Sequence, residues 1–514
     1  MSGCEYLSTD GTTPGVVAEA LGDHLQVTSA DPRDSDRTYY DTFDGLLHAA
    51  GMSAAYEDGE LVLVDRESGA VRARAHVVQP AQRLFAHDLE PGPLRDELLD
   101  VIEARALLPL ARVHARRRAL SVLDGERKTV VRMTLEEPAL VDNHGRLSIL
   151  RPRVRLAPVR GYDDELEQVK AALAGQLGLT AAEQPLADEA VRAAGREPQG
   201  ISSKISVELQ FGERTDVAAA RVLRRLLDVI EANTDGTVRD IDSEFLHDYR
   251  VSVRRTRSVQ RELKGAFAPE ALAHFRAEFR WLQQVTGDSR DLDVYVVDFD
   301  VMRSLVPDSM RSDLDPLLEV LRGRRLAARR QMISELRSPR VATLLEGWGA
   351  FLDELPSLDE IDRPDAARPI GEVAGARIVK VYGRMVKMGS AIDESSPAED
   401  YHELRKRGKE LRYLLELFGG PLYPEEVVKP MVKALKALQD VLGRHQDREV
   451  QVAMLSSLRD ELVSVRGGVA ALMATGALVA RLREDELAAR HEFAARFAAF
   501  SSKGQRKLVK ATFG

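Results

Sequence analysis

Four cationic or cationisable side chains recur at helical spacing near the middle of the chain: His247, Arg250, Arg254 and Arg257. At about 100° per residue, positions 0, 3, 7 and 10 fall on one helix face, in a band roughly 80° wide. The same pattern returns 155 residues later: His402, Arg405, Lys409 and Arg412. Imidazole, guanidinium and ammonium groups on one face are hydrogen-bond donors suited to an oxyanion, and the histidines gain charge as the pH falls.

Further bases lie at helical spacing on the helices expected before and after each stripe. They are Arg221, Arg224 and Arg225, then Arg276 and Arg280, in the first half, and Arg377, Lys380, Arg384 and Lys387, then Lys429, Lys433 and Lys436, in the second. Like charges at such spacings cost a helix a few tenths of a kcal/mol per pair. Helices packed about 8 to 10 Å apart would join the stripes into one basic surface, which an anionic partner would stabilise.

Two interpretations of the stripes are compatible with the sequence. A charged helix face is often a solvated one whose bases pair with acids of adjacent helices, and Glu262, Glu270 and Glu278 are available for this role. The first stripe, however, has no acid interleaved on its own face, and stripes recur on consecutive helices. We therefore favour a surface that binds an anion.

A second stretch is repeated as well. Residues 280–294 align with residues 436–450 at an offset of 156. Two matches at nearly the same offset indicate a tandem duplication. Each half would form a bundle of about four helices, and the halves would pack on a pseudo-two-fold axis.

Two pairs of acids follow a glycine in these repeats: Asp291 and Asp293 after Gly287, and Asp447 and Glu449 after Gly443. Because glycine can end a helix, we expect the acids in the first turn of the next helix, where carboxylates favour the helix dipole. Capping and pairing to the basic stripes is thus the favoured interpretation over metal binding.

The two His-x-x-Arg-x-x-x-Arg/Lys-x-x-Arg helices, with the Trp-Leu…Gly…Arg-Asp-Leu-Asp element after the first, resemble the CHAD family, the conserved histidine α-helical domain, over residues 212–500. The resemblance implies two four-helix bundles that bind inorganic polyphosphate through the eight stripe residues. We expect further polyphosphate contacts from the flanking helices: Arg221, Arg224, Arg280, Arg377, Lys380, Arg384, Lys387 and Lys436. In the second half Lys409 replaces an Arg and Gln446 replaces Arg290, so less specific binding is expected there, because Lys lacks the bidentate fork of Arg.

The first 200 residues have a different pattern. Short alternating runs predict antiparallel strands at 60–64, 70–78, 112–123, 128–136 and 147–156, followed by an amphipathic helix at 163–179. Beyond a Gly- and Ser-containing segment at 195–203, helical patterns separated by Gly and Pro continue to about residue 500. We therefore expect a multidomain chain: a flexible N-terminus (1–25), an α+β antiparallel barrel (26–185), a linker (186–211), a first helical bundle (212–362), a second helical bundle (363–500) and a basic tail (501–514).

The element that starts at Tyr39, Tyr-Tyr-Asp-Thr-Phe-Asp-Gly-Leu-Leu, and the later run from Leu123 to Arg132 resemble the CYTH family of triphosphate tunnel enzymes. The resemblance implies a closed barrel over about residues 25–185 whose lumen binds a triphosphate together with Mg²⁺ or Mn²⁺. The family's Glu-x-Glu-x-Lys strand is missing before Tyr39, and Arg151, Arg153 and Arg155 stand where the family has acids. We therefore expect a degenerate barrel with no catalytic residue, no metal and no cofactor.

The bases of this domain suggest a second anion site, because a period of two places them on shared strand faces. The site predicted from them consists of Arg116, Arg118, Lys128, Arg132, Arg151 and Arg153. Three alternatives stay open. The sheet could be open with a solvated basic side; Glu136 could survive as the lumen acid of a metal-dependent tripolyphosphatase that the helical domain supplies with polyphosphate; or Asp41, Asp44 or Glu57 could provide metal ligands.

The charge and composition of the chain limit the classes of molecule that it can bind. The 514-residue chain has 73 Lys and Arg against 82 Asp and Glu, a net charge of −9, but the first 200 residues hold 23 of the bases and 33 of the acids. The remainder is nearly neutral, so the acidic total does not exclude a polyanion. Aromatic residues make up 5% of the chain and are absent from the stripes, which disfavours nucleic acid as the partner, because its bases stack on aromatic side chains.

The sequence contains no membrane or secretion signal. The longest weakly polar stretch, 467–480, is shorter than the roughly 20 residues of a membrane span, and the first 20 residues lack a charged start and an apolar block. A lone cysteine, Cys4, cannot form an internal disulfide. We expect a cytoplasmic protein, with association to polyphosphate granules as one option, and no protein partner is indicated.

Overall fold

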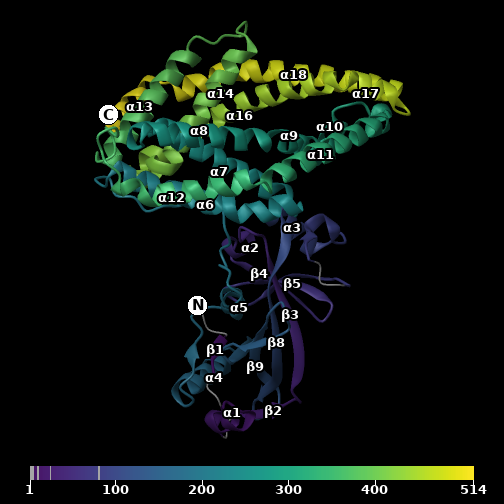
Figure 1. Cartoon of the computed structure of the whole chain (residues 1–514). Coiled ribbons are helices and arrows are strands. Elements are labelled where there is room, and N and C mark those ends of the chain that lie inside the picture. Colours follow the sequence, from purple (N-terminus) through teal and green to yellow (C-terminus); the bar gives the residue numbers. More distant parts are fainter. Residues whose placement is uncertain (1–4, 9–10, 23–24, 79–81) are drawn as a thin grey trace. The chain divides into compact units, whose positions relative to one another are not determined.

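The structure is a computed structural model that describes residues 5–8, 11–22, 25–78 and 82–514. The chain divides into two compact units, Met1–Ser202 and Ser203–Gly514, whose helices and strands are labelled in Figure 1. Cys4 lies outside the described residues. Of the helices that the structure describes, none has the length and apolar character that crossing a membrane requires.

An antiparallel sheet of twelve strands forms the N-terminal unit. The strands are β1 Glu5–Leu7, β2 Gln26–Ser29, β3 Arg33–Asp41, β4 Met52–Glu57, β5 Glu60–Asp65, β6 Val71–His76, β7 Leu84–Phe85, β8 Ala106–Leu123, β9 Thr129–Val141, β10 Leu147–Ile149, β11 Arg153–Pro158 and β12 Thr180–Ala181. Neighbours follow the order β12-β1-β11-β9-β8-β3-β4-β5-β6, with β2 and β7 beside β8 and β10 beside β9. As far as the described residues go, β12 and β6 end this path unpaired, so the sheet is a curled half-barrel and not the expected closed barrel (Figure 1).

Five helices accompany the sheet: α1 Pro14–Leu21, α2 Leu46–Ala49, α3 Pro93–Ile102, α4 Asp163–Gly175 and α5 Leu186–Ala193. Three apolar clusters lie between these helices and the strands. The strand predicted at 147–156 is divided into β10 and β11 around Pro152, which has no N–H to donate to a neighbouring strand. β3 and β4 were not predicted, because β3 begins with the polar run Arg-Asp-Ser-Asp-Arg, which hides its alternation.

The structure places regular elements in three segments that were expected to lack them. β1 and α1 lie in the expected flexible N-terminus, where Thr13 caps α1 and Pro14 occupies its first turn. α5 lies in the expected linker and buries Leu186 and Val191. The basic tail forms α19, Lys503–Phe513, which packs Val509 and Phe513 into the main core of the helical unit through their i, i+4 spacing.

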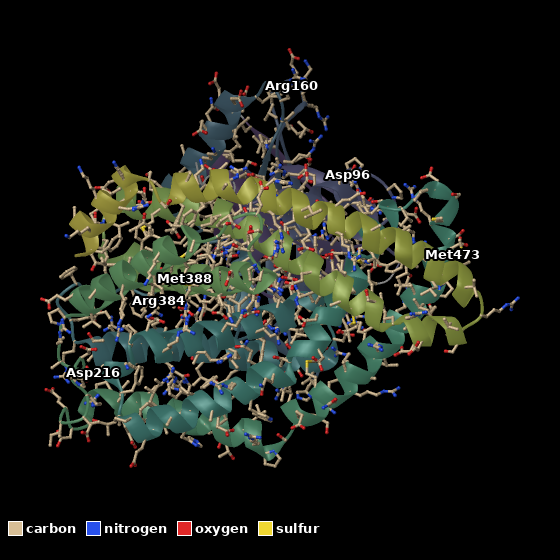
Figure 2. The ribbon with its side chains drawn as sticks, turned by 90° about the horizontal axis from the view of Figure 1, so that it is seen from above. Asp96, Arg160, Asp216, Arg384, Met388 and Met473 are labelled. Carbon is tan, nitrogen blue, oxygen red and sulfur yellow. The ribbon has the colours of Figure 1, made fainter. Side chains whose placement is uncertain are left out.

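The second unit is helical throughout. Its longer helices are α6 Thr215–Arg239, α7 Ser243–Glu262, α8 Pro269–Val285, α9 Gly287–Val297, α10 Phe299–Ser304, α11 Asp315–Leu336, α12 Pro339–Glu354, α13 Ile370–Gly389, α14 Ala398–Leu414, α16 Glu425–Ser457, α17 Arg459–Ser464 and α18 Gly468–Phe500. One hydrophobic core joins α6, α7, α8 and α12 to α13, α14, α16 and α18. A second core lies where α9, α10 and α11 meet the ends of α16 and α18 that adjoin α17, and Met473 of α18 lies at this end of the unit, far from Asp216 of α6 (Figure 2).

The predicted breaks between helices are found near Pro269, Pro307, Pro356, Pro397 and Pro421. The tandem bundles and their pseudo-two-fold axis stay predictions. The two halves differ in one respect: α8 ends and α9 begins around Gly287, whereas α16 continues through the equivalent Gly443.

Candidate anion-binding site

Helix α7 is enclosed by neighbouring helices except along the face that carries the first stripe. No residue of α7 is fully exposed, and its half-buried positions recur every three or four residues along the stripe. Asp242 caps the helix by accepting hydrogen bonds from the N–H groups of Glu244 and Phe245. A side chain at Gly236 of α6 would collide with the ring of Phe245, so this glycine allows α7 to pack closely on α6.

The middle of the first stripe has no carboxylate within ion-pair distance among the described residues, although Asp291 and Asp288 act on Arg250 from farther away. Arg250 donates to the backbone oxygen of Gln283 (3.0 Å) and to Oγ1 of Thr286 (2.9 Å). Nε of Arg250 and Nε of Arg254 are buried and have no hydrogen-bond partner among the described residues. Burial, followed by repulsion from Arg254, lowers the pKa of Arg250 to about 10. An unpaired buried donor costs about 1–3 kcal/mol, so this stretch of α7 is destabilised in the free protein.

Lys409 of α14 faces the same cations from the second stripe. Burial, followed by repulsion from Arg405 and Arg254, lowers the pKa of Lys409 to about 8, although Asp447 acts in the opposite direction. Since α7 packs against α14, the two stripes meet at Arg254 and Lys409. We call Arg250, Arg254 and Lys409 the central cluster; within the described part of the chain, none of them forms an ion pair with a carboxylate at 4.0 Å or less.

Two bases of α8 extend the central cluster. Burial, and then repulsion from Arg280, Arg261 and Arg276, lowers the pKa of Arg257. Arg280, predicted as a contact residue, and Arg276 therefore lie beside the first stripe. The first stripe thus gains positive charge from a second helix.

The second stripe is more fully paired than the first. Arg405 lies 3.0 Å from Asp447, and Nε of Arg412 lies 2.7 Å from Glu416. The Asp447 side chain is 61% exposed, and pairs of this kind contribute little to stability. Arg405 can therefore exchange its carboxylate for a phosphate at small cost.

Other predicted bases have different environments. Arg221 pairs with Glu213 (3.1 Å), and Arg224 pairs with Asp353 and donates to the backbone oxygen of Gly349. These two arginines tie α6 to its neighbours and do not join the central cluster. Among the remaining predicted bases, Arg377 of α13 is half-buried, and the others are exposed: Lys380, Arg384 (labelled in Figure 2) and Lys387 on α13, and Lys436 on α16.

The acids expected in first turns lie elsewhere: Asp291 and Asp293 in the second turn of α9, and Asp447 and Glu449 in the middle of α16. The first-turn prediction is wrong because burial of neighbours such as Leu442 outweighs the roughly 1 kcal/mol cost of an interior glycine in α16. Asp447 does pair with a stripe residue, as described above. Asp293 instead lies 2.5 Å from Arg325 of α11.

The two histidines head their stripes but meet different partners. Nη2 of Arg290 lies 3.2 Å from Nδ1 of His247. Nδ1 of His402 is hydrogen-bonded to Oε1 of Gln446, the residue that takes the place of Arg290 in the second repeat. At equivalent positions of the two repeats, one imidazole therefore meets a guanidinium group and the other meets an amide oxygen.

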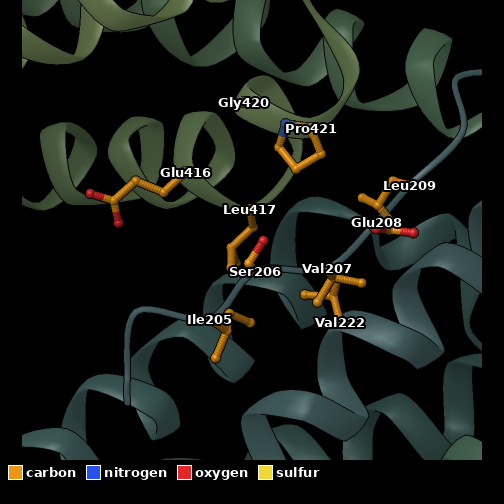
Figure 3. A pocket seen from close by; sticks show the side chains of 10 residues that line it. All are labelled: Ile205, Ser206, Val207, Glu208, Leu209, Val222, Glu416, Leu417, Gly420 and Pro421. Atoms are coloured by element: carbon orange, nitrogen blue, oxygen red, sulfur yellow. The ribbon is translucent and has the colours of Figure 1, made fainter. Parts of the chain in front are cut away.

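A cavity of about 430 Å³ lies in the helical unit between the extended segment 205–209 and the π-helical turn Leu415–Gly419 (Figure 3). Its lining combines aliphatic residues with Ser206 and two carboxylates, Glu208 and Glu416. Glu416 already accepts hydrogen bonds from Arg255 (2.8 Å) and Arg412 (2.7 Å). This cavity supplies no cation for an anionic ligand, in contrast to the central cluster.

Replacement of Lys409 by Met should stabilise the protein at neutral pH. The pKa of Lys409 is lower in the folded protein than in the unfolded chain, so at pH 7 the folded state bears the cost of a repelled charge, and this cost disappears as the pH rises above about 8. We expect the free energy of unfolding to rise by roughly 1–3 kcal/mol at pH 7 and by much less at pH 9.5.

Urea unfolding of the full chain at both pH values measures this effect. Lys406→Met is the matched control, because Lys406 is exposed on the same helix and pairs with Glu403. A stability gain for Lys409→Met that is equal at the two pH values, or a loss at pH 7, would contradict the electrostatic origin.

In the N-terminal unit, the sheet buries a network of arginine and glutamate side chains. Glu136, only 2% exposed, accepts from Arg117 (2.9 Å) and lies 3.5 Å from both Arg37 and Arg155. Arg37 and Arg117 also pair with Glu57. Glu136, the candidate lumen acid, therefore has its oxygens engaged by guanidinium groups.

The six bases of the predicted barrel site are only partly brought together. Arg116, Arg118 and Arg153 line one cavity of about 340 Å³, which also includes Arg117, Glu136 and Glu137. The Arg153 side chain is fully buried and pairs with Glu5 (3.2 Å) and Glu189. The other three lie apart: Arg151 pairs with Glu189, Lys128 pairs with Glu126, and Arg132 is exposed on β9.

The alternative metal ligands are engaged in structural contacts. Asp41 accepts three backbone N–H groups, at 2.6 to 2.9 Å, around the start of α2, and burial raises its pKa to about 6 despite these bonds. Asp44 pairs with Arg105 at 3.1 Å, and Glu57 belongs to the network above. Among the described residues, no group of three or more His, Cys, Asp or Glu side chains could hold a metal ion.

Curated relatives match part of the chain. Over 222 residues, 42% of this chain, the sequence is 28% identical to two uncharacterized proteins of Mycobacterium tuberculosis, one from strain CDC 1551 / Oshkosh and one from strain ATCC 25618 / H37Rv. The match spans 40% of the length of each of these relatives.

Two solved structures are similar to part of the chain. The crystal structure of the CHAD domain from the plant Ricinus communis has a TM-score of 0.48 at 24% identity and covers 58% of this chain and 96% of that one. PptA from Streptomyces chartreusis has a TM-score of 0.40 at 17% identity and covers 55% of this chain and 99% of that one. The sequence model of the CHAD domain matches residues 221–456, from α6 to the end of α16. Both basic stripes and the central cluster lie inside the residues that this sequence model matches.

Proposed function

We propose that the helical unit binds inorganic polyphosphate along the surface where the stripes of α7 and α14 meet. The observation that carries the proposal is the central cluster: half-buried cations from two helices, without a carboxylate partner among the described residues. Cations that depress one another's pKa are stabilised by an anion that neutralises them. The match to the sequence model of the CHAD domain adds support, because the family resemblance implies this ligand.

The length of the stripes favours a polyanion over a single phosphate. The ten steps from His247 to Arg257 span about 15 Å at 1.5 Å per residue. The stripe of α14 adds a second row of similar length. A linear polyanion can neutralise both rows, whereas one phosphate reaches only a few of their donors.

Titration of the full chain with long-chain polyphosphate at several salt concentrations tests the proposal. Each neutralised phosphate releases counterions, at a slope of about −0.7 in log K per log salt for a single-stranded polyanion. If the stripes neutralise five to seven phosphates, the expected slope is about −3.5 to −5. Competition with single-stranded RNA at fixed salt separates polyphosphate from nucleic acid. The absence of saturable binding at low salt would refute the proposal.

For the N-terminal unit we propose a lapsed triphosphate barrel that assists anion docking without catalysing phosphate release. The support is the engagement of Glu136, Glu57, Asp41 and Asp44 in ion pairs and a helix cap, which leaves few carboxylate oxygens for Mg²⁺ or Mn²⁺. Phosphate release from tripolyphosphate by the full chain with either metal, lost on Glu136→Gln, would favour the enzyme alternative.

A further inference from the structure

The environment of His247 determines which of its nitrogens carries the proton. Arg290 has only donors, so Nδ1 of His247 accepts the hydrogen bond between them. The single proton of the neutral ring is then on Nε2. Arg290 is itself held by the backbone oxygen of Ser243 (3.4 Å) and by Glu244 (3.5 Å), which fixes the guanidinium against the imidazole.

The environment of His402 leads to the opposite tautomer. Nε2 of Gln446 donates to Oε2 of Glu449 at 3.1 Å, and because a carboxylate only accepts, Glu449 fixes the orientation of the Gln446 amide. Oε1 of Gln446 therefore faces Nδ1 of His402, and the hydrogen bond between them requires a proton on Nδ1. In the neutral ring, Nε2 of His402 then has a lone pair and no proton.

We infer that Arg290 and Gln446 are positioning residues that make the two half-sites chemically different. Neutral His247 carries its proton on Nε2, whereas His402 can donate from Nε2 only as the imidazolium. Binding of polyphosphate to the second half is therefore coupled to uptake of a proton by His402. The inference deepens the proposed function and rests on it.

The charges around His402 set the direction of the coupling. Arg405 and Lys409 share its helix, and Arg405 and Arg254 of α7 both repel Lys409. On α16, Asp447 pairs with Arg405 and Glu449 accepts from Gln446. Phosphates that neutralise the bases remove the repulsion and add attraction, so bound polyphosphate favours the imidazolium. Affinity is then expected to fall by up to about 10-fold per pH unit where bound His402 loses its proton.

The coupling to His402 can be tested by placing the residue of the first repeat at the equivalent position of the second. Gln446→Arg gives His402 the partner that His247 already has, so Nδ1 becomes an acceptor and the neutral ring carries its proton on Nε2. Proton coupling should disappear. His247→Gln should lower the affinity by a similar factor at each pH and leave the proton uptake unchanged.

Calorimetry of the full chain with long-chain polyphosphate, whose end groups are few, measures proton uptake at pH 7 from the difference between two buffers of unlike ionisation enthalpy. A Lys409→Arg background removes the titration of Lys409. In this background we expect uptake of a substantial fraction of one proton, and a large decrease on adding Gln446→Arg or His402→Gln. Binding without proton uptake, or uptake unchanged by Gln446→Arg, would overturn the inference. A complete lack of binding would instead refute the proposed function.

A measurement without ligand tests the tautomers directly. In histidine-selectively ¹⁵N-labelled protein above pH 8, two-bond proton–nitrogen correlations should assign the Nε2–H tautomer to His247 and the Nδ1–H tautomer to His402. Replacement of each histidine by Gln identifies its signals. The Nε2–H tautomer at both positions would overturn the inference whatever the ligand does.

Discussion

Replacement of Arg250, Arg254, Arg405 and Lys409 by Glu should lower the affinity for long-chain polyphosphate at least about 1,000-fold at 0.15 M salt. Charge-assisted hydrogen bonds contribute about 1.5–3 kcal/mol each, so the loss of three of them suffices for this factor. The four new carboxylates also repel the ligand. Each of the four wild-type side chains repels at least one of the others in the free protein, so their removal also ends an unfavourable interaction.

A second quadruple variant controls for net charge. Reversal of the four predicted bases of α13 changes the charge of the protein by the same amount: Arg377, Lys380, Arg384 and Lys387. If polyphosphate binds at the central cluster, this variant should lose only several-fold in affinity. Micromolar or tighter binding by the first variant, or equal losses in both, would exclude the central cluster as the main site. Titration by calorimetry, with circular dichroism to verify folding, measures both.

The composition of each stripe could be predicted from the sequence because helical spacing is a local property. Residues 247, 250, 254 and 257 share a face in any regular helix, and α7 and α14 are regular over their stripes. That Arg254 meets Lys409 could not be predicted in this way, because it depends on how two helices separated by more than 130 residues pack. The depressed pKa of Lys409 is thus a tertiary property.

The arginine and glutamate network of the sheet was missed for two reasons. β3, which supplies Arg37, begins with a polar run and gave no alternation signal. The site predicted on β8 used the parity of Arg116 and Arg118, whereas Arg117 lies directly opposite Glu136 in the β8–β9 register. Counting back from the turn at residues 124–128 would have suggested this pair, although a register shift at Val122 complicates the count.

The histidine partners show what an internal repeat can reveal. The replacement of Arg290 by Gln446 was visible in the sequence as a departure between the two halves. Its consequence could not be derived there, because the orientation of the Gln446 amide depends on Glu449, one helical turn further along α16. Comparison of the two repeats therefore shows where the half-sites differ, and the contacts in the structure show what the difference is.

The central cluster also explains why stability and binding should oppose each other in this unit. Unpaired cations weaken the free protein, as the lowered pKa values of Arg250 and Lys409 indicate. The fold must then gain its stability elsewhere. One such place is the ion pair between Arg363 and Asp216, whose side chains are 1% and 0% exposed and whose atoms lie 3.2 Å apart.

Arg363→Met should lower the free energy of unfolding of the helical unit by about 3–5 kcal/mol, the cost of breaking a buried pair. Arg363 also donates to the backbone oxygens of Asp359, Leu355 and Leu358, and Asp216 lies in the first turn of α6. The pair thus ties the start of α6 to the end of α12 and to the segment that leads into α13. Its loss leaves a buried carboxylate whose ion pair among the described residues is then with Arg214.

Arg368→Met is the matched control, because Arg368 forms a half-exposed pair with Asp365 nearby, and such pairs contribute at most about 1 kcal/mol. Urea unfolding compares the two variants. Polyphosphate should raise the stability of both by the same increment at equal free ligand, since neither residue belongs to the central cluster and ligand that binds only the folded state stabilises it by RT ln(1 + [L]/Kd). Equal destabilisation by the two substitutions would show that the Arg363 pair has no special role. A smaller polyphosphate increment for Arg363→Met would show instead that this pair helps to hold α6 and α7 in their binding arrangement.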